Sequence, residues 1–480
     1  MSSYRKILKN LSYLSVSEVV SKIIILFIFV LLANYLGSEL FGQFSYGFAF
    51  AMIAVVLVDL GLNYLNVIEI SQDKKIASKL LINSFVLKIP FFGITTIGII
   101  LILQYINFSP EKILVIILLC LYTFIKSFSE LSFAIFRAFE RMEYDSSIKI
   151  FRNILLILLI FVLIRAKANI VALVATFPAI ELLTFIISLC FIYTKFIPLS
   201  FDLDWKYMKK LFWRTAPFSG TVLIGAVYFY LSSIILSQLK GDAALGVFSA
   251  SYNLVLGISF IPQIYTGAIF PVLSRVYKRS LKTFTFVYQK SMKYLWIIGL
   301  PVGVGAYVLA NRIILTFYNQ GYIESAIVLK ILAIFIPLKF LNYLMGSVLS
   351  VAKNQPKRLL CQSITALASV LFSFLFIPVY SFKGAALAVI LAELLLLGLY
   401  FVYTSKILGF HNFLPMMVKP CLAALCMAII LILIKLNLFL EIVIGAIVYV
   451  LALFFLKSYD PTDKEILEKI LKKKDIKTQN

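Results

Sequence analysis

The chain of 480 residues is 62% hydrophobic and only 14% charged, with a mean hydropathy of +1.00. A soluble domain is typically about half apolar and about one quarter charged, so one water-soluble core could not bury this much apolar surface. Apolar runs of roughly 20 residues recur along the whole chain, which is the length that an α-helix needs to cross a bilayer. The composition therefore excludes soluble enzyme folds and predicts an all-α polytopic membrane protein.

The first apolar stretch follows a short basic segment at the N-terminus. It is too long for the core of a cleaved signal peptide and no small-residue cleavage site follows it, so we expect an uncleaved first helix. Apolar windows bounded by charge clusters and Gly or Pro turns then predict about fourteen transmembrane spans. In chain order they cover residues 13–36, 46–70, 80–105, 112–136, 150–166, 169–194, 217–238, 244–273, 291–311, 325–352, 359–380, 384–405, 415–435 and 438–457.

The basic residues predict the orientation of these spans. The chain has 45 Lys and Arg against 22 Asp and Glu, a formal charge of +23. If the N-terminus and every second loop are cytoplasmic, 33 basic residues lie on that side and 7 on the other, with five inside spans. This asymmetry predicts that both termini are cytoplasmic. The positive charge then acts as a topological signal with some attraction to anionic lipid, and nucleic acid is not an expected partner.

A short internal repeat predicts how the spans are grouped. Residues 37–45 and 241–249 both read G-x-x-x-x-G-x-F-S, displaced by 204 residues, and both follow equivalent spans on the outer side. Two six-helix lobes are therefore predicted, related by an axis along the membrane normal because six is even. Such lobes predict a V-shaped molecule with a central cavity. The predicted divisions are a first lobe in 1–194, a second lobe in 195–405, two extra helices in 406–457 and a basic amphipathic tail in 458–480.

Lysines inside spans are candidate binding residues, because an ionisable group at membrane depth costs about 2.5–3.5 kcal/mol. The candidates are Lys22, Lys88, Lys330 and Lys339. Lys22 lies roughly 14 Å into its predicted helix, near mid-membrane. Lys330 and Lys339 are nine residues apart in one predicted span, so on a continuous helix they would face opposite directions.

Two acids inside spans are candidates for ion coupling. Neither Asp59 nor Glu393 has a basic partner one turn away on its own helix. A hydrogen bond between helices is the alternative explanation for each. Two other acids have a simpler structural explanation, because Glu18 with Lys22, and Lys126 with Glu130, are spaced to neutralise each other on one helix face.

Patterns typical of catalysis or metal binding are missing from the sequence. The chain has one histidine, His411, and no P-loop, nucleophile elbow or Asp-rich metal motif. The cysteines contain no CxxC pair and are expected to be thiols within the membrane, at positions Cys120, Cys190, Cys361, Cys421 and Cys426. We therefore expect no catalytic residues, no metal site and no cofactor.

Several short motifs, taken in order, resemble those of a transporter family. They are residues 36–45 (LGSELFGQFS), 59–62 (DLGL), 270–274 (FPVLS), 377–380 (IPVY) followed by 384–386 (GAA), and Glu393. With six, six and two spans, this arrangement is similar to the Wzx-type oligosaccharide-lipid flippases. These form the polysaccharide-export branch of the multidrug/oligosaccharidyl-lipid/polysaccharide superfamily.

The resemblance implies a function without enzyme activity. A member of this family would move an undecaprenyl-pyrophosphate-linked oligosaccharide from the cytoplasmic to the outer leaflet of a bacterial inner membrane by alternating access. An ion gradient is the expected energy source, and the product would feed synthesis of O-antigen, capsule or another surface polysaccharide. A polysaccharide polymerase and a chain-length regulator are further partners that the resemblance implies.

The related lipid II flippases place a basic residue after a serine in their first helix. Ser21-Lys22 resembles that position, which implies that Lys22 contacts pyrophosphate. Those flippases have a second basic residue further along the helix, where this chain is apolar around Ile28. The departure argues against lipid II as the cargo.

Three other functions remain open from the sequence. A drug or small-cation exporter of the same superfamily would have a cavity dominated by acids, whereas lysines and acids both occur within spans here. A membrane polysaccharide polymerase or ligase would favour long outer loops rich in Arg and His, and these are absent from the sequence. A purely structural membrane scaffold would leave the buried lysines without a reason.

Overall fold

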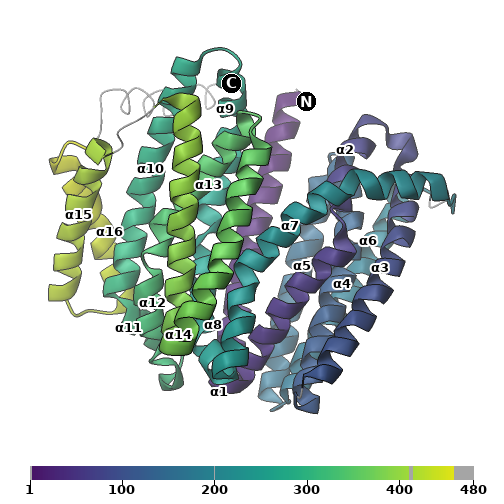
Figure 1. The fold of residues 1–480 in the computed structure, drawn as a ribbon, viewed down its shortest axis with the longest axis horizontal. Coiled ribbons are helices and arrows are strands. Elements are labelled where there is room, and N and C mark those ends of the chain that lie inside the picture. Colours follow the sequence, from purple (N-terminus) through teal and green to yellow (C-terminus); the bar gives the residue numbers. More distant parts are fainter. Residues whose placement is uncertain (1–2, 107, 199–200, 410–413, 459–480) are drawn as a thin grey trace, which may run out of the picture. The chain divides into compact units, whose positions relative to one another are not determined.

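The computed structural model describes residues 3–106, 108–198, 201–409 and 414–458, and its regular secondary structure there is entirely helical (Figure 1), which confirms the predicted all-α class. His411 and residues 459–480 of the predicted tail lie outside these ranges. The elements are α1 (Ser3–Asp59), α2 (Leu62–Gln72), η1 (Lys74–Ile76), α3 (Ala77–Tyr105), α4 (Pro110–Ala138), α5 (Met142–Arg165), α6 (Ile170–Lys195), α7 (Trp205–Lys240), α8 (Asp242–Ile258), α9 (Phe260–Tyr277), α10 (Leu281–Val308), α11 (Ala310–Phe317), η2 (Gln320–Tyr322), α12 (Ser325–Leu332), α13 (Phe335–Val351), α14 (Gln355–Leu408), α15 (Leu414–Leu433) and α16 (Leu438–Phe455).

Short polar residues mark the start of several apolar helices. Asn169, Asp204, Ser280 and Asn437 each accept a hydrogen bond from a backbone N–H two or three residues further on. Such N-caps satisfy amide groups that have no partner within the helix. These caps, placed between apolar runs, fix where α6, α7, α10 and α16 begin.

The number of spans differs from the prediction. Within the described residues, eleven helices are long and apolar enough to cross a membrane, or up to twelve if α12 and α13, bent by 41°, form one span. The predicted count of fourteen is therefore not confirmed. The two longest helices, α1 and α14, are each interrupted by one non-helical residue, Gly37 and Ser381. The predominantly apolar span of 44 residues in α1 corresponds to about 66 Å of helix, roughly twice the thickness of a hydrocarbon core.

Three other predicted spans are interrupted or end early. The second span ends at Asp59, before a left-handed Leu60 and Gly61, and not at residue 70. The eighth is divided at Ser259 into α8 and α9, and the tenth is bent between α12 and α13. Pro262 and Pro337 are each the third residue of the helix that follows a break. The N–H groups of a first helical turn have no partner within the helix, so proline loses no hydrogen bond there.

The chain divides into two compact units. Unit 1 comprises the described residues of Met1–Phe260, Tyr318–Val328 and Leu359–Ala392, and unit 2 those of Ile261–Phe317, Leu329–Arg358 and Glu393–Asn480. The helices α7 and α8, predicted to open the second lobe, belong to unit 1 in this division. The two six-helix lobes and the V shape stay predictions.

Unit 1 is built around α1, which packs against α4, α5, α7 and α8 (Figure 1). A core of apolar side chains from α2, α3 and α4 includes the fully buried Leu80, Leu131 and Phe133. The first turns of α7 are held to α2 by an ion pair between Arg214 and Glu69. Tyr207 donates to the same carboxylate at 3.3 Å, and burial together with Glu69 raises the pKa of Tyr207 to about 12, so its phenol remains a donor.

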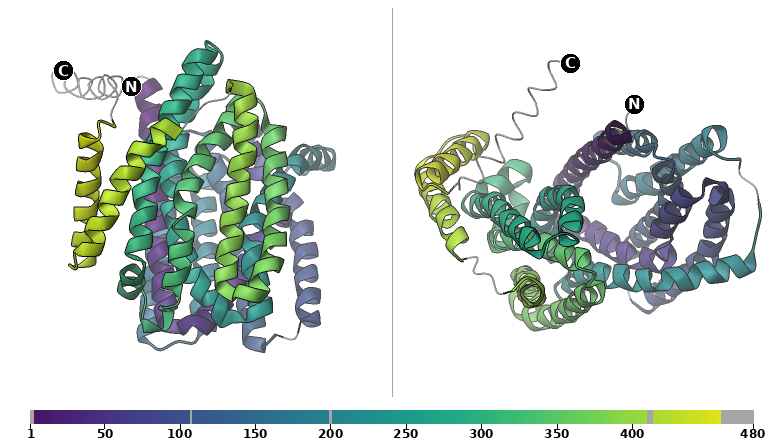
Figure 2. Two further views of the ribbon diagram at one scale, coloured as in Figure 1. Left: turned by 60° about the vertical axis from the view of Figure 1, so that its left-hand side comes forward. Right: turned by 90° about the horizontal axis from the view of Figure 1, so that it is seen from above.

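Unit 2 joins the last two helices to α10. The helices α15 and α16 lie side by side (Figure 2), and α15 also packs against α10 and α13 packs against α10. An ion pair between Arg312 of α11 and the buried Glu441 connects α11 to the first turn of α16. Glu441 also accepts a hydrogen bond of 2.8 Å from the backbone N–H of Leu436, which begins the turn before α16.

The two copies of the repeated motif contact each other reciprocally within unit 1. A Cβ atom at Gly42 would overlap the backbone carbonyl of Asp242, and a Cβ atom at Gly246 would overlap the carbonyl of Ser38. Each glycine is displaced from the other by 204 residues, and so are the two carbonyl groups. The contact is therefore reciprocal: the glycine of each motif meets the backbone carbonyl at the same position of the other motif.

The Asp242 side chain fastens the same contact to α4. Lys112 donates to both carboxylate oxygens, at 2.7 and 2.9 Å, and Ser237 donates at 2.5 Å. The Lys112 ammonium also lies 4.4 Å from the ring centroid of Tyr46 and 4.2 Å from that of Phe108. A buried lysine is thus neutralised by an acid and by aromatic faces.

We expect Gly42→Ala and Gly246→Ala each to destabilise the protein by about 1–3 kcal/mol, because the added methyl group overlaps a backbone carbonyl. The measurement is the loss of monodisperse protein in detergent after heating. Gly93→Ala is the matched control, because a Cβ there meets no atom within 4 Å. If both variants were as heat-resistant as Gly93→Ala, the reciprocal contact would not support the fold.

Candidate functional site

A cavity of about 300 Å³ in unit 1 lies where α1, α7 and α8 meet. Lys22 is on its wall and is half-buried, which places this predicted binding residue at a cavity. The other lining residues are Ile25, Leu26, Phe29, Phe44, Ser45, Phe48, Ala49, Tyr230, Ser233, Ser249, Tyr252, Asn253, Leu256 and Gly257. We call this the axial cavity.

The axial cavity is lined by equivalent positions of the two repeats. Five pairs of its lining residues are displaced by the same 204 residues as the glycine motif: Leu26 and Tyr230, Phe29 and Ser233, Ser45 and Ser249, Phe48 and Tyr252, and Ala49 and Asn253. The cavity therefore lies between chain positions that are equivalent under this displacement. Its two walls differ in chemistry, since the first repeat supplies mainly apolar side chains and the second supplies hydroxyl and amide groups.

A second cavity, of about 420 Å³, adjoins the axial cavity at Tyr230, which lines both. Its polar lining consists of Asp59, Asn63, Thr123, Lys126, Ser127, Glu130 and Tyr230, with apolar residues of α1 and α7 around them. We call this the charged cavity. It contains Asp59, one of the two acids predicted for ion coupling, and Lys126, which the sequence explained as a neutralised pair.

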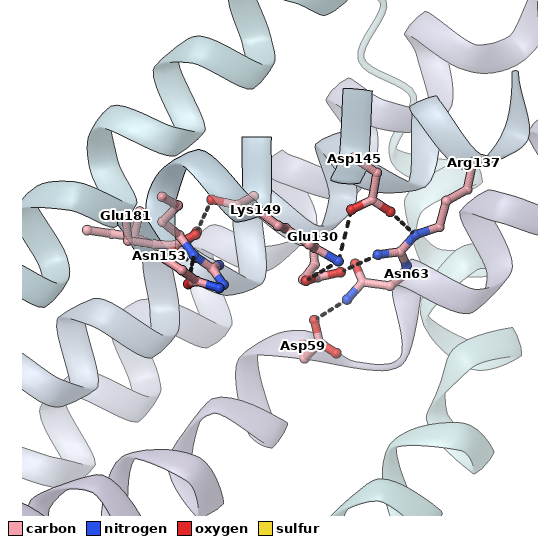
Figure 3. Close-up of polar contacts among 11 residues, drawn as sticks. Asp59, Asn63, Glu130, Arg137, Asp145, Lys149, Asn153 and Glu181 are labelled. Atoms are coloured by element: carbon pink, nitrogen blue, oxygen red, sulfur yellow. Dashed lines mark hydrogen bonds and ion pairs between the residues drawn. The ribbon is translucent and has the colours of Figure 1, made fainter. Parts of the chain in front are cut away.

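The carboxylate of Asp59 lies within a closed hydrogen-bond network. Lys88 donates to Asp59 Oδ1 at 2.8 Å and to the hydroxyl and carbonyl oxygens of Ser127 at 2.7 and 2.8 Å. Ser127 and Asn63 donate to the same carboxylate oxygen at 2.8 and 3.0 Å, and Figure 3 shows Asn63 beside Asp59. All three protons of the fully buried Lys88 ammonium therefore form hydrogen bonds. The Asp59 side chain is 25% exposed.

A belt of charged residues continues from this network across α4, α5 and α6 (Figure 3). Arg137 binds Glu130 at 3.0 Å and Asp145 at 2.6 Å, and Lys149 binds Asp145 at 2.9 Å. Further along the belt, Arg152 binds Glu181 of α6 at 3.2 Å. The belt with the Asp59 network holds five bases, Lys88, Lys126, Arg137, Lys149 and Arg152, and four acids, Asp59, Glu130, Asp145 and Glu181.

The direct ion pair predicted between Lys126 and Glu130 is not formed. Glu130 pairs with Arg137 and lies 3.6 Å from Lys149 of the next helix. Lys126 forms no ion pair within the described residues, and its ammonium lies 5.8 Å from the ring centroid of Tyr122. Lys126 is half-buried and lines the charged cavity, so an anion within that cavity would meet its ammonium group.

Unit 2 contains a buried acid with a lysine partner. Lys339 donates to Glu393 Oε2 at 3.2 Å, and Asn342 donates to Glu393 Oε1 at 2.8 Å and to its carbonyl at 3.0 Å. The Glu393 side chain is fully buried. Neither Asp59 nor Glu393 has a basic partner one turn away on its own helix, and each is paired with a lysine of another helix that was predicted for binding.

Lys330 and Lys339 do not lie on one continuous helix, as the prediction of their opposite directions assumed. The two residues lie on different helices, α12 and α13, which are bent by 41°. Lys330 is half-buried and forms no ion pair within the described part of the chain. A continuous helix therefore does not determine which way the two side chains face.

Metal ligands and thiols do not form a site in the described ranges. No group of three or more His, Cys, Asp or Glu side chains that could hold a metal ion occurs among these residues. All five cysteines are free, with Cys120 and Cys361 buried, Cys421 partly buried, and Cys190 and Cys426 exposed. The prediction of buried thiols thus holds for two of them.

Comparison with known proteins places the chain in a family. Residues 7–277, more than half of the chain, match the polysaccharide biosynthesis protein family. The chain belongs to this family. It is 23% identical over 416 residues to the capsular polysaccharide biosynthesis protein CapF of Staphylococcus aureus, which covers 83% of this chain and 99% of the relative. It is 25% identical over 205 residues to a putative O-antigen transporter of Shigella flexneri, over 41% of this chain and 48% of the relative.

Solved structures share the fold of this family member. A lipid II flippase, MurJ, in an inward closed conformation matches with a TM-score of 0.74 at 16% identity, covering 92% of this chain and 97% of that chain. An inward-facing multidrug resistance transporter of the MATE family and the MOP superfamily matches with a TM-score of 0.67 at 17% identity, covering 81% and 94%. The resemblance predicted from the sequence motifs is confirmed, and the protein is a multi-pass membrane protein with the fold of MOP transporters.

The buried pair in unit 1 predicts a compensating double substitution. Lys88→Met alone leaves Asp59 without its cation and should destabilise the protein by about 3–5 kcal/mol. Adding Asp59→Leu removes the uncompensated charge and should restore most of that loss. Thermal unfolding in detergent measures the cycle. A double variant less stable than either single variant would show that the pair is not coupled.

Proposed function

We propose that this protein is a flippase for undecaprenyl-pyrophosphate-linked oligosaccharides. It would move repeat units from the cytoplasmic to the outer leaflet of a bacterial inner membrane for surface polysaccharide synthesis. The observation that carries the proposal is the axial cavity with the adjoining charged cavity. Together they combine accessible lysines with a wall of hydroxyl, amide and aromatic groups at the interface of two repeats, where transporters of this construction bind substrate.

The lysines suit the pyrophosphate of such a cargo. A pyrophosphate that leaves water needs cations and donors to replace its hydration, and a lysine supplies a point charge with three donors. Lys22 and Lys126 line the two adjoining cavities and are the candidates for this contact. Lys88 and Lys339 are less suited because each is already paired with an acid. The belt's excess of one positive charge also favours an anion.

The polar wall suits the sugars. Tyr230, Ser233, Tyr252 and Asn253 offer donors and acceptors that match carbohydrate hydroxyl groups, and the aromatic faces of Phe29, Phe44 and Phe48 suit the apolar faces of sugar rings. A small-cation or drug exporter fits less well, because the acids of the charged cavity, Asp59 and Glu130, are both neutralised by bases.

Asp59 is the better candidate for ion coupling. Its carboxylate lines the charged cavity and keeps 25% of its exposure, so a proton or a sodium ion can reach it, whereas Glu393 is fully buried. Binding a cation at Asp59 would weaken its attraction for Lys88 and alter the network that joins α1, α3 and α4. We propose this exchange as the coupling step. The polymerase and chain-length regulator would act on the product in the outer leaflet.

The first prediction from this function concerns topology. Both termini and the loop at Lys278 should be cytoplasmic, because basic residues concentrate on that side. In a variant without the five native cysteines, Lys278→Cys should react with a membrane-impermeant maleimide only after the membrane is permeabilised. Labelling in intact cells would contradict the topology and the direction of transport.

The second prediction concerns the pyrophosphate contact. Lys22→Ala and Lys126→Ala should abolish surface polysaccharide and cause the lipid-linked oligosaccharide to accumulate inside, while Lys22→Arg and Lys126→Arg should keep much of the activity because they keep the charge. Lys240→Ala, an exposed lysine outside both cavities, is the control. Protein amounts are compared on blots of purified membranes. Normal surface polysaccharide from both alanine variants would remove the proposed contact.

The third prediction separates coupling from binding. Asp59→Asn keeps the size of the side chain and its ability to form hydrogen bonds but removes the charge. A proton or sodium gradient should therefore no longer accelerate transport. Binding of the cargo in the absence of a gradient should remain. Gradient-dependent transport by a stably inserted Asp59→Asn variant would assign coupling elsewhere.

A further inference from the structure

A third cavity in unit 1 is apolar and opens on the outside of the helices. It has a volume of about 880 Å³ and lies between α1, α3 and α7. Its rim includes Leu57, Ile94 and Ile102, which are 50%, 67% and 47% exposed. In a membrane these residues face hydrocarbon. We call this cavity the lateral groove.

The lateral groove adjoins the charged cavity. Val56 of α1 lines both, and along α7 the residues lining the groove alternate with those lining the charged cavity. Thus Gly220 and Leu223 line the groove while Val222 and Gly225 line the charged cavity. The contact between α1 and α7 therefore separates the charged cavity from the apolar lateral groove.

The length of the groove exceeds one leaflet. On α1 its lining runs from Tyr46 to Leu60, which is about 21 Å of helix, whereas one leaflet of a hydrocarbon core is roughly 15 Å thick. An ordinary acyl chain occupies a single leaflet. A chain that spans the groove must be longer, as a polyprenyl chain is. At one end of the groove Gln238 donates to the Tyr46 hydroxyl at 3.0 Å, so a polar contact borders the apolar surface there.

Two glycines give the groove its depth. Gly98 of α3 and Gly220 of α7 line it, and a Cβ atom at either position would meet no atom within 4 Å. Both lie inside helices, where glycine is less favourable than alanine by roughly 1 kcal/mol. The missing side chains therefore cost helix stability and leave open volume.

We propose that the lateral groove binds the polyprenyl chain of the cargo while its pyrophosphate occupies the cavities beyond α1 and α7. The proposal rests on the proposed function and adds the site of the lipid. The chain would follow the head group along the groove across the bilayer, so its hydrocarbon remains in an apolar environment throughout. The alternative occupant is ordinary membrane phospholipid.

Substitutions that fill the groove test this site. The full-length protein is reconstituted in vesicles of phosphatidylethanolamine and phosphatidylglycerol, and binding of undecaprenyl pyrophosphate is compared with that of geranyl pyrophosphate. Gly98→Trp and Gly220→Trp should weaken binding of the long probe about tenfold, or about 1.4 kcal/mol, and leave the short probe unchanged. Gly93→Trp, on α3 in open space outside the groove, should change neither.

Direct contact is tested by photo-cross-linking. A benzophenone amino acid at Ile94 should label undecaprenyl pyrophosphate, and the label should be competed by unlabelled probe and not by added phospholipid. Ile89, exposed on another face of the same helix, is the control position. Labelling that phospholipid competes equally well, or groove-filling variants that bind both probes as the wild type does, would overturn the proposal.

The same probes distinguish this proposal from the proposed function. Lys22→Gln with Lys126→Gln should weaken both probes equally, because the pyrophosphate is common to them. If these variants bound both probes normally while Gly98→Trp lost the long one, the groove would stand and the head-group site would fail. If the lysine variants lost both probes while Gly98→Trp kept the long one, the groove would fail and the head-group site would stand.

Discussion

The close approach of Gly42 to Asp242 and of Gly246 to Ser38 is the constraint on which the rest of unit 1 depends. No side chain fits at either glycine, so α1 and α8 meet backbone to backbone at one end of the unit. The contact is reciprocal, and five residue pairs related by the same displacement of 204 residues line the axial cavity. Equivalent residues of the two repeats thus face one another across a space.

Buried charge is the second constraint, and the protein meets it by pairing between helices. Lys88 with Asp59, Arg152 with Glu181, and Lys339 with Glu393 each join different segments of the chain. Such pairs rarely add stability over apolar packing, yet removal of one partner leaves a costly buried charge. A pair of this kind is therefore suited to a two-state element, because a change of charge at one member alters the packing of two helices. Lys126 differs, since it lines a cavity and forms no ion pair within the described residues.

The sequence predicted the features that depend on composition and spacing. The all-α membrane class follows from long apolar runs, and the repeat of 37–45 in 241–249 identified the segments that meet reciprocally. The same displacement of 204 residues could also have predicted the five cavity-lining pairs, once it was known which helix faces point inward. The partners of Asp59 and Glu393 could not be predicted, because they are 29 and 54 residues away and lie on other helices. An i, i+4 rule considers one helix only, and for that reason it assigned Glu130 to Lys126. The helix breaks at Ser259 and between α12 and α13 depend on the backbone at single positions, which apolar windows do not resolve.

A reconstituted transport assay directly tests the proposal that the chain moves a pyrophosphate-linked sugar across a bilayer. Purified protein is placed in vesicles that contain undecaprenyl-pyrophosphate-linked sugar labelled on its head group with a fluorophore that external dithionite bleaches. With the wild-type protein, dithionite should bleach the probe of both leaflets, and a variant carrying Lys22→Ala and Lys126→Ala should bleach only the outer-leaflet probe, as vesicles without protein do. A head-group-labelled phosphatidylethanolamine should stay protected in the inner leaflet in every case. Wild-type vesicles that bleach no more than protein-free vesicles, or that expose phosphatidylethanolamine equally, would contradict the account.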